Sequence, residues 1–166
     1  TPVISSAASD VYKRQAMTLA EAGLEPIRIS VASPEHMEKY GRVLDSSLQI
    51  EWVVDSSPYA GPIEAILDAL TDPFCNDPLQ IAPVDVPWLE LDLLVDLERG
   101  IGDCKVAMPV CSGRTHPLLA LIRPEVANLV GSSRRPLRDQ FRGMDHVLVE
   151  AREEVVRNIN QPSDLE

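Results

Sequence analysis

Two aspartates that follow strand-type segments are the first candidates for chemistry in this chain. Asp55 comes directly after IEWVV, and Asp85 follows the apolar stretch LQIAPV. In an open α/β sheet, ligands bind beyond the carboxyl ends of the strands. If the two strands are neighbours, both carboxylates lie at one crevice, where they can hold Mg²⁺ against substrate phosphates. The pair therefore predicts a metal-assisted site for a phosphorylated ligand.

Each aspartate also has an ordinary structural interpretation. Aspartate at the end of a strand is common as a turn residue or helix cap, and a proline and a helical segment follow both residues. For either residue alone, capping is the simpler interpretation. The occurrence of two such aspartates in one alternating pattern keeps the functional interpretation open beside it.

The segments that must position these aspartates alternate between strand and helix patterns. Such alternation predicts βαβ units, a largely parallel sheet and an α/β fold. The spacing between Val110 and Pro117 predicts one antiparallel insertion near the sheet edge. Strands are expected at residues 27–31, 50–54, 79–84, 106–110, 117–122 and 146–149, and helices at residues 16–23, 34–40, 62–70, 89–97, 124–130 and 136–141, with a helical turn following residues 158–162.

The composition limits the classes of function. A chain of 166 residues with 45% hydrophobic and 25% charged residues fits one globular domain. The net charge of −11 argues against a nucleic-acid surface, although it does not exclude a single nucleotide. No apolar run is long enough to cross a membrane. Three cysteines without a CxxC pair favour free thiols in a reducing cytoplasm over a disulfide framework or a zinc site.

The first fifteen residues do not share this patterning. Residues 1–15 (TPVISSAASDVYKRQ) are mostly small or polar, contain no glycine and show no periodicity. We interpret them as a tail that does not belong to the native protein, the alternative being a genuine but poorly ordered N-terminus. Residues 16–166 are then expected to form a single domain.

Four segments of the chain resemble the molybdenum cofactor guanylyltransferases, in the order that this family has. Residues 83–89 (PVDVPWL) are similar to its "cDxPfl" segment, and Asp55 followed by residues 61–63 (GPI) is similar to its "D…GPl" segment. Residues 116–121 (HPLLAL) resemble its "hPl.Al" strand, and residues 158–165 (NINQPSDL) resemble its closing "NiNtPedl" segment. The last two segments are the more specific, since related nucleotidyltransferases share the aspartate motif.

The resemblance implies a Rossmann-like, three-layer nucleotidyltransferase domain that transfers GMP from GTP to molybdenum-bound molybdopterin and releases diphosphate. Asp85 would be the catalytic Mg²⁺ ligand, which also contacts the nucleotide. Asp55, Gly61 and Pro62 would bind the nucleotide. Molybdoenzymes or other proteins of cofactor biosynthesis are the partners that this function implies.

The chain departs from that family at its N-terminal end. The family begins with a strand and a loop of the form LAGGxSxRMGxxK, whose glycines let backbone N–H groups approach phosphates. No such segment occurs here, and Lys13 and Arg14 have no glycine beside them. Val31 also stands where the family often has asparagine. We therefore expect this polypeptide to bind GTP weakly or not at all, and we expect the strands beside the absent first strand to have unpaired edges.

Further candidates carry both a functional and a structural interpretation. Arg134 and Arg135 could clamp a pterin phosphate, or could lie on a solvated helix face. His116 could act as a base at the crevice, although histidine before proline is more often structural. Asn158 and Asn160 either fix a C-terminal turn or reach the crevice. The rival functions are a nucleotidyltransferase that uses CTP or a sugar phosphate, and a non-catalytic nucleotide-binding fragment.

Overall fold

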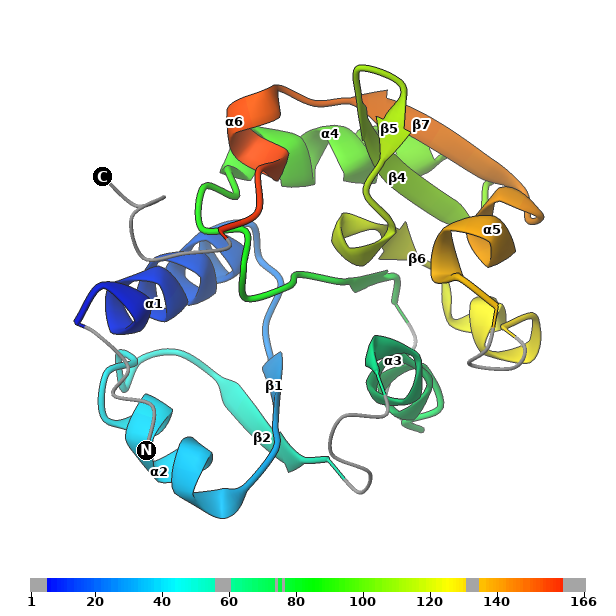
Figure 1. The fold of residues 1–166 in the computed structure, drawn as a ribbon. Coiled ribbons are helices and arrows are strands. Elements are labelled where there is room, and N and C mark those ends of the chain that lie inside the picture. The colour runs from blue at the N-terminus through cyan, green and yellow to red at the C-terminus, as the bar shows by residue number, and fades with distance from the viewer. Residues whose placement is uncertain (1–5, 56–60, 74, 76, 131–134, 160–166) are drawn as a thin grey trace.

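The computed structural model of the chain describes residues 6–55, 61–73, 75, 77–130 and 135–159 (Figure 1). The helices are α1 (Ser6–Glu21), α2 (Pro34–Gly41), α3 (Pro62–Leu70), α4 (Leu91–Ile101), α5 (Leu137–Arg142) and α6 (Glu153–Val156), with 3-10 turns η1 (Pro117–Leu119) and η2 (Pro124–Asn128). The strands are β1 (Ile27–Val31), β2 (Ile50–Val54), β3 (Leu79–Gln80), β4 (Val106–Cys111), β5 (Arg114–Thr115), β6 (Leu121–Ile122) and β7 (His146–Glu150). No helix in these ranges is long and apolar enough to span a membrane.

The described strands form two sheets. In the first, β1 and β2 run parallel, with Ile27 opposite Ile50 and Val31 opposite Val54. The second has the order β3-β6-β4-β5, and β7 lies parallel to the central strand β4. The strands β3, β5 and β6 are short and pair antiparallel. The two longest pairings are therefore parallel, and they lie in different parts of the molecule (Figure 1).

Strand β4 is the centre of the core, because its sequence VAMPVC is buried along nearly its whole length. Continuous apolar sequence of this kind is typical of a strand that is covered on both faces. One face packs against α4 and α6, and the other packs against α3 and α5. In α4 the buried residues follow the helical period: Leu93, Leu94, Leu97 and Ile101.

The predicted α/β fold is confirmed, and several elements have the predicted bounds. The strands over residues 27–31 and 50–54 and the helix from Pro62 to Leu70 lie where the patterns put them. The antiparallel insertion is also confirmed, since Val110 pairs with Thr115 across a tight turn. Two predicted strands are shorter than expected. Residues 79–84 form a strand only at Leu79–Gln80, and residues 117–122 begin with η1 before β6.

Prolines account for both shortened strands. Pro83 and Pro117 have no N–H group to donate to a neighbouring strand, and proline fixes φ near the value of a turn. Pro117 accordingly starts η1, and strand β6 begins only at Leu121. The predicted helix over residues 124–130 is a 3-10 turn.

The predicted N-terminal tail differs from the structure for residues 6–15, which form the first turns of α1. Alanine, lysine, arginine and glutamine in this segment favour a helix even without an apolar period. Residues 6–15 are therefore not disordered, while their origin outside the native protein stays a prediction. Tyr12 stacks on Tyr40 with ring centroids 4.4 Å apart. The side chain of Gln15 is buried and donates to the carbonyl oxygens of Pro83 (2.8 Å) and Val86 (2.6 Å).

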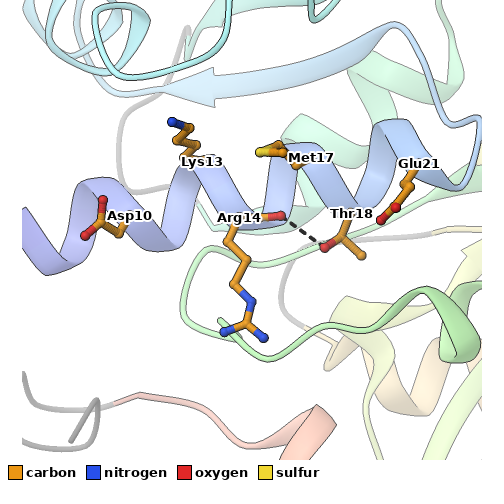
Figure 2. Close-up of a pocket in the computed structure, with 6 residues that line it drawn as sticks. All are labelled: Asp10, Lys13, Arg14, Met17, Thr18 and Glu21. Atoms are coloured by element: carbon orange, nitrogen blue, oxygen red, sulfur yellow. Dashed lines mark hydrogen bonds between the residues drawn. The ribbon is translucent and has the colours of Figure 1, made fainter.

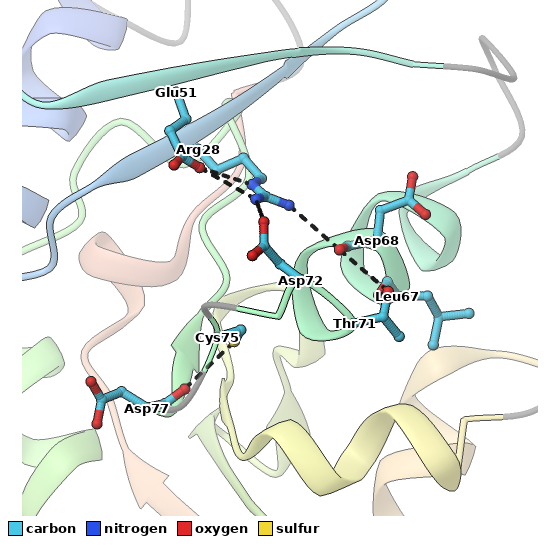
Figure 3. A network of polar contacts seen from close by, with 8 residues as sticks. All are labelled: Arg28, Glu51, Leu67, Asp68, Thr71, Asp72, Cys75 and Asp77. Atoms are coloured by element: carbon cyan, nitrogen blue, oxygen red, sulfur yellow. Dashed lines mark hydrogen bonds and ion pairs between the residues drawn. The ribbon is translucent and has the colours of Figure 1, made fainter.

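An arginine network joins the β1–β2 sheet to α3 (Figure 3). Arg28 on β1 donates to the carboxylate of Glu51, which lies opposite it on β2, at 3.3 Å. It also pairs with Asp72 just beyond α3 and donates to the Asp68 carbonyl oxygen at 3.4 Å. Burial lowers the pKa of Arg28, but the bonds to Asp72 and Glu51 outweigh that effect and raise it. The network holds the sheet that leads to Asp55 against the helix that follows Gly61.

Candidate functional site

Asp85 and Asn158 are in direct contact, although they are 73 residues apart in the sequence. Asp85 lies in the loop between β3 and α4, and the Asn158 side-chain amide donates to its carboxylate at 3.1 Å. The next residue, Ile159, donates its backbone N–H to the Asp85 carbonyl oxygen at 2.7 Å. The structure therefore places Asn158, a predicted crevice residue, in contact with Asp85, the predicted metal ligand.

The segment that carries Asn158 packs along the Asp85 loop, and we call residues 152–159, which include α6, the C-terminal clasp. Val155 and Val156 of the clasp are buried against Val86 and Leu89. Polar contacts connect the two segments in reverse chain order: Asn158 with Asp85, the Arg157 guanidinium 5.0 Å from the centre of the Trp88 ring, and Arg152 in an ion pair with Glu90.

The opposite side of the loop rests on α1 through the two hydrogen bonds of Gln15. The Asp85 backbone is thus fixed from two directions, and the carboxylate is half-buried. An ionised carboxylate offers about four lone-pair positions, so a bond from one amide leaves acceptor capacity for a cation. Oxygen ligands of this type suit Mg²⁺, which commonly takes one or two carboxylates together with substrate phosphates. The Asp85 side chain therefore fits a magnesium ligand.

Asp55 occupies a comparable position at the end of β2. The Ser30 hydroxyl donates to its carboxylate, and its own N–H donates to the Val31 carbonyl oxygen at 2.9 Å. Asp55 and Asp85 do not follow adjacent strands, because β2 pairs with β1 and β3 pairs with β6. Within the described ranges, no group of three or more His, Cys, Asp or Glu side chains could hold a metal. A metal at Asp85 would therefore need further ligands from a substrate or from water.

Gly61 and Pro62 begin α3. Gly61 has φ of 96°, a left-handed conformation that favours glycine, and Pro62 suits the first turn of a helix. A Cβ added at Gly61 would meet no atom within 4 Å. The positive φ therefore accounts for glycine at position 61, and no neighbouring atom would clash with a Cβ atom there. The segment 56–60, which links Asp55 to Gly61, lies outside the described residues.

His116 is half-buried before η1, and its backbone N–H donates to the Pro109 carbonyl oxygen at 2.9 Å. Burial, with a smaller contribution from Arg114, lowers the pKa of the imidazole. Arg135 is exposed, and its carbonyl oxygen accepts a bond from Gln140 at 2.8 Å. Two further predicted residues, Arg134 and Asn160, lie outside the described residues, so the phosphate clamp stays a prediction.

Comparison with known families decides the class of this domain. The MobA-like NTP transferase domain family matches residues 4–154. The chain belongs to this family. As an NTP transferase domain it is a nucleotidyltransferase, which agrees with the class of enzyme that the aspartate segments and the closing asparagine segment indicate.

Solved structures give the same fold at low sequence identity. The 4-diphosphocytidyl-2C-methyl-D-erythritol synthase of Anaerococcus prevotii superposes with a TM-score of 0.66 at 10% identity, covering 93% of this chain and 85% of that one. The 2-C-methyl-D-erythritol 4-phosphate cytidylyltransferase of Thermus thermophilus gives a TM-score of 0.52 at 13% identity, covering 91% and 84%. A comparison with curated proteins gives no match.

Two residues beside Asp85 in this NTP transferase domain were not recognised as site residues from the sequence. The sequence patterns singled out neither Trp88 nor Arg157 as a residue that contacts a ligand. The position of Arg157 directly before the Asn-Ile-Asn segment was the available signal. Its contact with Trp88 depends on the clasp folding back over the loop, which spacing does not reveal.

A shallow hollow on α1 is less informative (Figure 2). All of its lining side chains come from this one helix, and they include both acidic and basic groups, so no single type of ligand is favoured. The lining residues are Asp10, Lys13, Arg14, Met17, Thr18 and Glu21.

Proposed function

We propose that this nucleotidyltransferase moves GMP from GTP to the terminal phosphate of molybdenum-bound molybdopterin. The contact between Asp85 and Asn158 carries the proposal. Both residues belong to segments that resemble molybdenum cofactor guanylyltransferases, and the resemblance alone does not say that the two segments meet. Their contact favours one shared site over two unrelated structural motifs.

In this reaction an acceptor phosphate oxygen attacks the α-phosphorus of GTP. The bond from that phosphorus to the bridging oxygen breaks, and diphosphate leaves with the electron pair. Mg²⁺ would supply charge neutralisation on the triphosphate. Asp85 is the proposed ligand, Asn158 holds its carboxylate in one orientation, and Asp55 with Gly61 contacts the nucleotide. Positioning of this kind accounts for much of the catalysis of nucleotidyl transfer.

Cytidylyl transfer is the second candidate. The two solved structures described above are a diphosphocytidyl-methylerythritol synthase and a cytidylyltransferase by name. In addition, Val31 stands where the guanylyltransferases often have asparagine, which weakens the argument for guanine. The acceptor would then be a phosphorylated sugar alcohol in place of a pterin.

A nuclear magnetic resonance titration of the chain with GTP and with CTP, each with Mg²⁺, distinguishes these candidates. Because the 166 residues contain no Gly-rich loop, we expect binding in the millimolar range, a standard free energy of about −4 kcal/mol. GTP should shift the amide signals of residues 83–88 and 157–159 more than CTP does. Larger shifts with CTP would favour the second candidate, and no shift with either nucleotide would contradict both. Micromolar GTP binding would contradict the expected weakness.

Replacing Asn158 with alanine should weaken metal binding without unfolding the chain. The amide orients the Asp85 carboxylate, and the loss of such an outer partner typically lowers metal affinity about 10-fold to 100-fold. Asn158 is exposed, so the free energy of unfolding should change by less than about 1 kcal/mol. Paramagnetic broadening by Mn²⁺ of the amide signals around Asp85 measures the first effect, and urea unfolding measures the second. If Asn158→Ala and the unchanged chain are broadened at the same Mn²⁺ concentration, Asn158 does not position the Asp85 carboxylate for metal binding.

A further inference from the structure

Strand β7 (His146–Glu150) is an open edge of the larger sheet. It lies on the outside of that sheet, next to β4 (Figure 1). All of its residues pair with β4, and no other strand of the described ranges pairs with it. One side of β7 is therefore hydrogen-bonded within the chain, and its other side is left for a further strand.

The backbone groups along β7 alternate between β4 and this open edge. The Asp145 carbonyl oxygen accepts a bond from an N–H group of β4 at 3.3 Å, and Ala151 donates to a carbonyl oxygen of the same strand at 2.9 Å. The odd-numbered residues of this segment therefore bond to β4, as a parallel ladder requires. The N–H and C=O groups of His146, Leu148 and Glu150 accordingly point to the open edge.

This edge lacks the features that usually prevent a sheet from pairing with another chain. Such features include proline, lysine, a bulge and a very short strand. The sequence HVLVE contains neither proline nor lysine, and its pairing with β4 has no break in register. Leu148, in the middle of the strand, is 44% exposed although it is a large apolar residue. The edge is therefore suited to pairing with a strand of another molecule.

The strand is complementary to a second copy of itself in the antiparallel orientation. With Leu148 opposite Leu148 of the second copy, His146 lies opposite Glu150, and Val147 lies opposite Val149. In this register each residue that points to the open edge exchanges both backbone bonds with its opposite residue. Apolar pairs are favourable across strands, whereas like charges directly opposite each other are not. The register keeps the two Glu150 carboxylates apart, which matters for a chain with a net charge of −11.

We propose that two copies of this chain associate through β7, in antiparallel orientation about a two-fold axis at Leu148, so that their larger sheets become one continuous sheet. Both copies then contribute the same surface, as is usual for a symmetric dimer. One strand pair buries a small area, so the dimer is weak and forms at high protein concentration. The pairing does not depend on Asp85 or on nucleotidyl transfer.

Sedimentation velocity at increasing protein concentration should show a monomer–dimer equilibrium for the unchanged chain. Amide hydrogen exchange, followed by nuclear magnetic resonance, identifies the surface that pairs. The amides of His146, Leu148 and Glu150 should exchange more slowly as the dimer forms, because they gain hydrogen bonds. Those of Val147 and Val149 bond to β4 in both states, so their exchange should change less. A monomer at every concentration would overturn the proposal, as would a dimer that leaves exchange at the first three residues unchanged.

Leu148→Lys should raise the dissociation constant of the dimer about tenfold or more, because it removes an apolar pair and places two ammonium groups opposite each other. Leu129→Lys is the matched control, since Leu129 is 49% exposed just beyond η2, away from β7. Its dissociation constant should stay within about twofold of the unchanged value. Thermal unfolding checks that both variants are folded. An equal effect of the two substitutions would exclude β7 as the interface.

Exchanging the charged residues tests the register itself. His146→Glu places carboxylates opposite each other, and Glu150→Lys places lysine opposite His146, so each should weaken the dimer about threefold or more. Glu150→Lys also makes the net charge less negative, and general repulsion between copies would predict a tighter dimer.

The double variant His146→Glu, Glu150→Lys places glutamate opposite lysine again. Its dissociation constant should return to within about twofold of the unchanged value. This variant also lacks the contact between the His146 ring and the Met144 carbonyl oxygen, so recovery cannot come from that contact. If the double variant is as weak as the single ones, the proposed register is wrong and the pairing through β7 is overturned.

Discussion

An Asp85→Asn variant is expected to need on the order of a hundredfold more Mn²⁺ than the unchanged chain for the same paramagnetic broadening around residues 83–88. Loss of a partner that only orients a metal ligand costs about 10-fold to 100-fold, so loss of a charged ligand should reach at least the upper end of that range. Divalent magnesium and manganese both bind carboxylate oxygens, which makes Mn²⁺ a suitable probe of a magnesium site.

Asp85→Asn removes the negative charge of the side chain while the hydrogen bonds that hold the loop are kept. Ile159 donates to the backbone carbonyl oxygen of residue 85, a contact that the variant keeps. Asn158 can donate to the new side-chain amide oxygen as it does to the carboxylate. The Gln15 bonds to Pro83 and Val86 are also to the backbone. The loop should therefore stay in place while its negative charge is lost.

Asp96→Asn is the matched control, because Asp96 is exposed on α4 and the substitution changes net charge by the same amount. Its Mn²⁺ titration should match that of the unchanged chain. If Asp85→Asn broadens at the same Mn²⁺ concentration as the unchanged protein, Asp85 is not a metal ligand and its contact with Asn158 is only structural. An equal loss in both variants would show a general electrostatic effect.

Local patterns were sufficient to predict the elements that flank the candidate site. The β-branched run at Ile27–Val31 and the apolar period of Pro62–Leu70 are properties of short windows, and both elements formed as expected. The division into two sheets was not predictable in that way. The division arises because β3 pairs with β6, from which 40 residues separate it, and does not pair with β2. Pairing between such distant segments is a property of the whole chain.

Local sequence patterns also did not predict which residues of the candidate site meet. Asp85 and Asn158 were each singled out, but only the folded clasp brings them together. Gln15 was set aside because residues 1–15 lack an apolar period, yet a single polar side chain can be buried if its hydrogen bonds are satisfied. The one available signal for Arg157 was its position directly before the Asn-Ile-Asn segment. Side-chain contacts between distant segments were therefore what sequence reasoning missed.

Asp55 and Asp85 also belong to two different parts of the fold. Arg28 connects the sheet that ends at Asp55 to α3 through Asp72, so one polar network joins the elements that carry the proposed nucleotide residues (Figure 3). The Asp85 loop and the clasp belong instead to the core around α4. A nucleotidyl transfer needs the nucleotide and the acceptor to approach each other, and the two parts would each supply one of these ligands.

Phe141→Ala should give the largest loss of stability. The ring lies on α5, is fully buried, and packs in the core on the opposite face of β4 from the clasp. Removing a buried phenylalanine costs about 3–5 kcal/mol of unfolding free energy, through lost burial and the cavity that remains. For a domain of this size each 1 kcal/mol lowers the melting temperature by about 2–4 °C, so a decrease of about 6–20 °C is expected. Differential scanning calorimetry measures it.

Leu148→Ala is the control for loss of apolar surface without a cavity, since Leu148 on β7 is 44% exposed. Its melting temperature should change by only a few degrees, as is usual for exposed positions. A similar small change for Phe141→Ala would mean that the core face formed by α3 and α5 is loosely packed. Because Phe141 and Asp85 belong to opposite faces of the sheet, the folded Phe141→Ala protein should still bind Mn²⁺ as the unchanged chain does. Loss of Mn²⁺ binding in the folded variant would show that the two faces are coupled, and the Asp85 loop would then depend on the whole core.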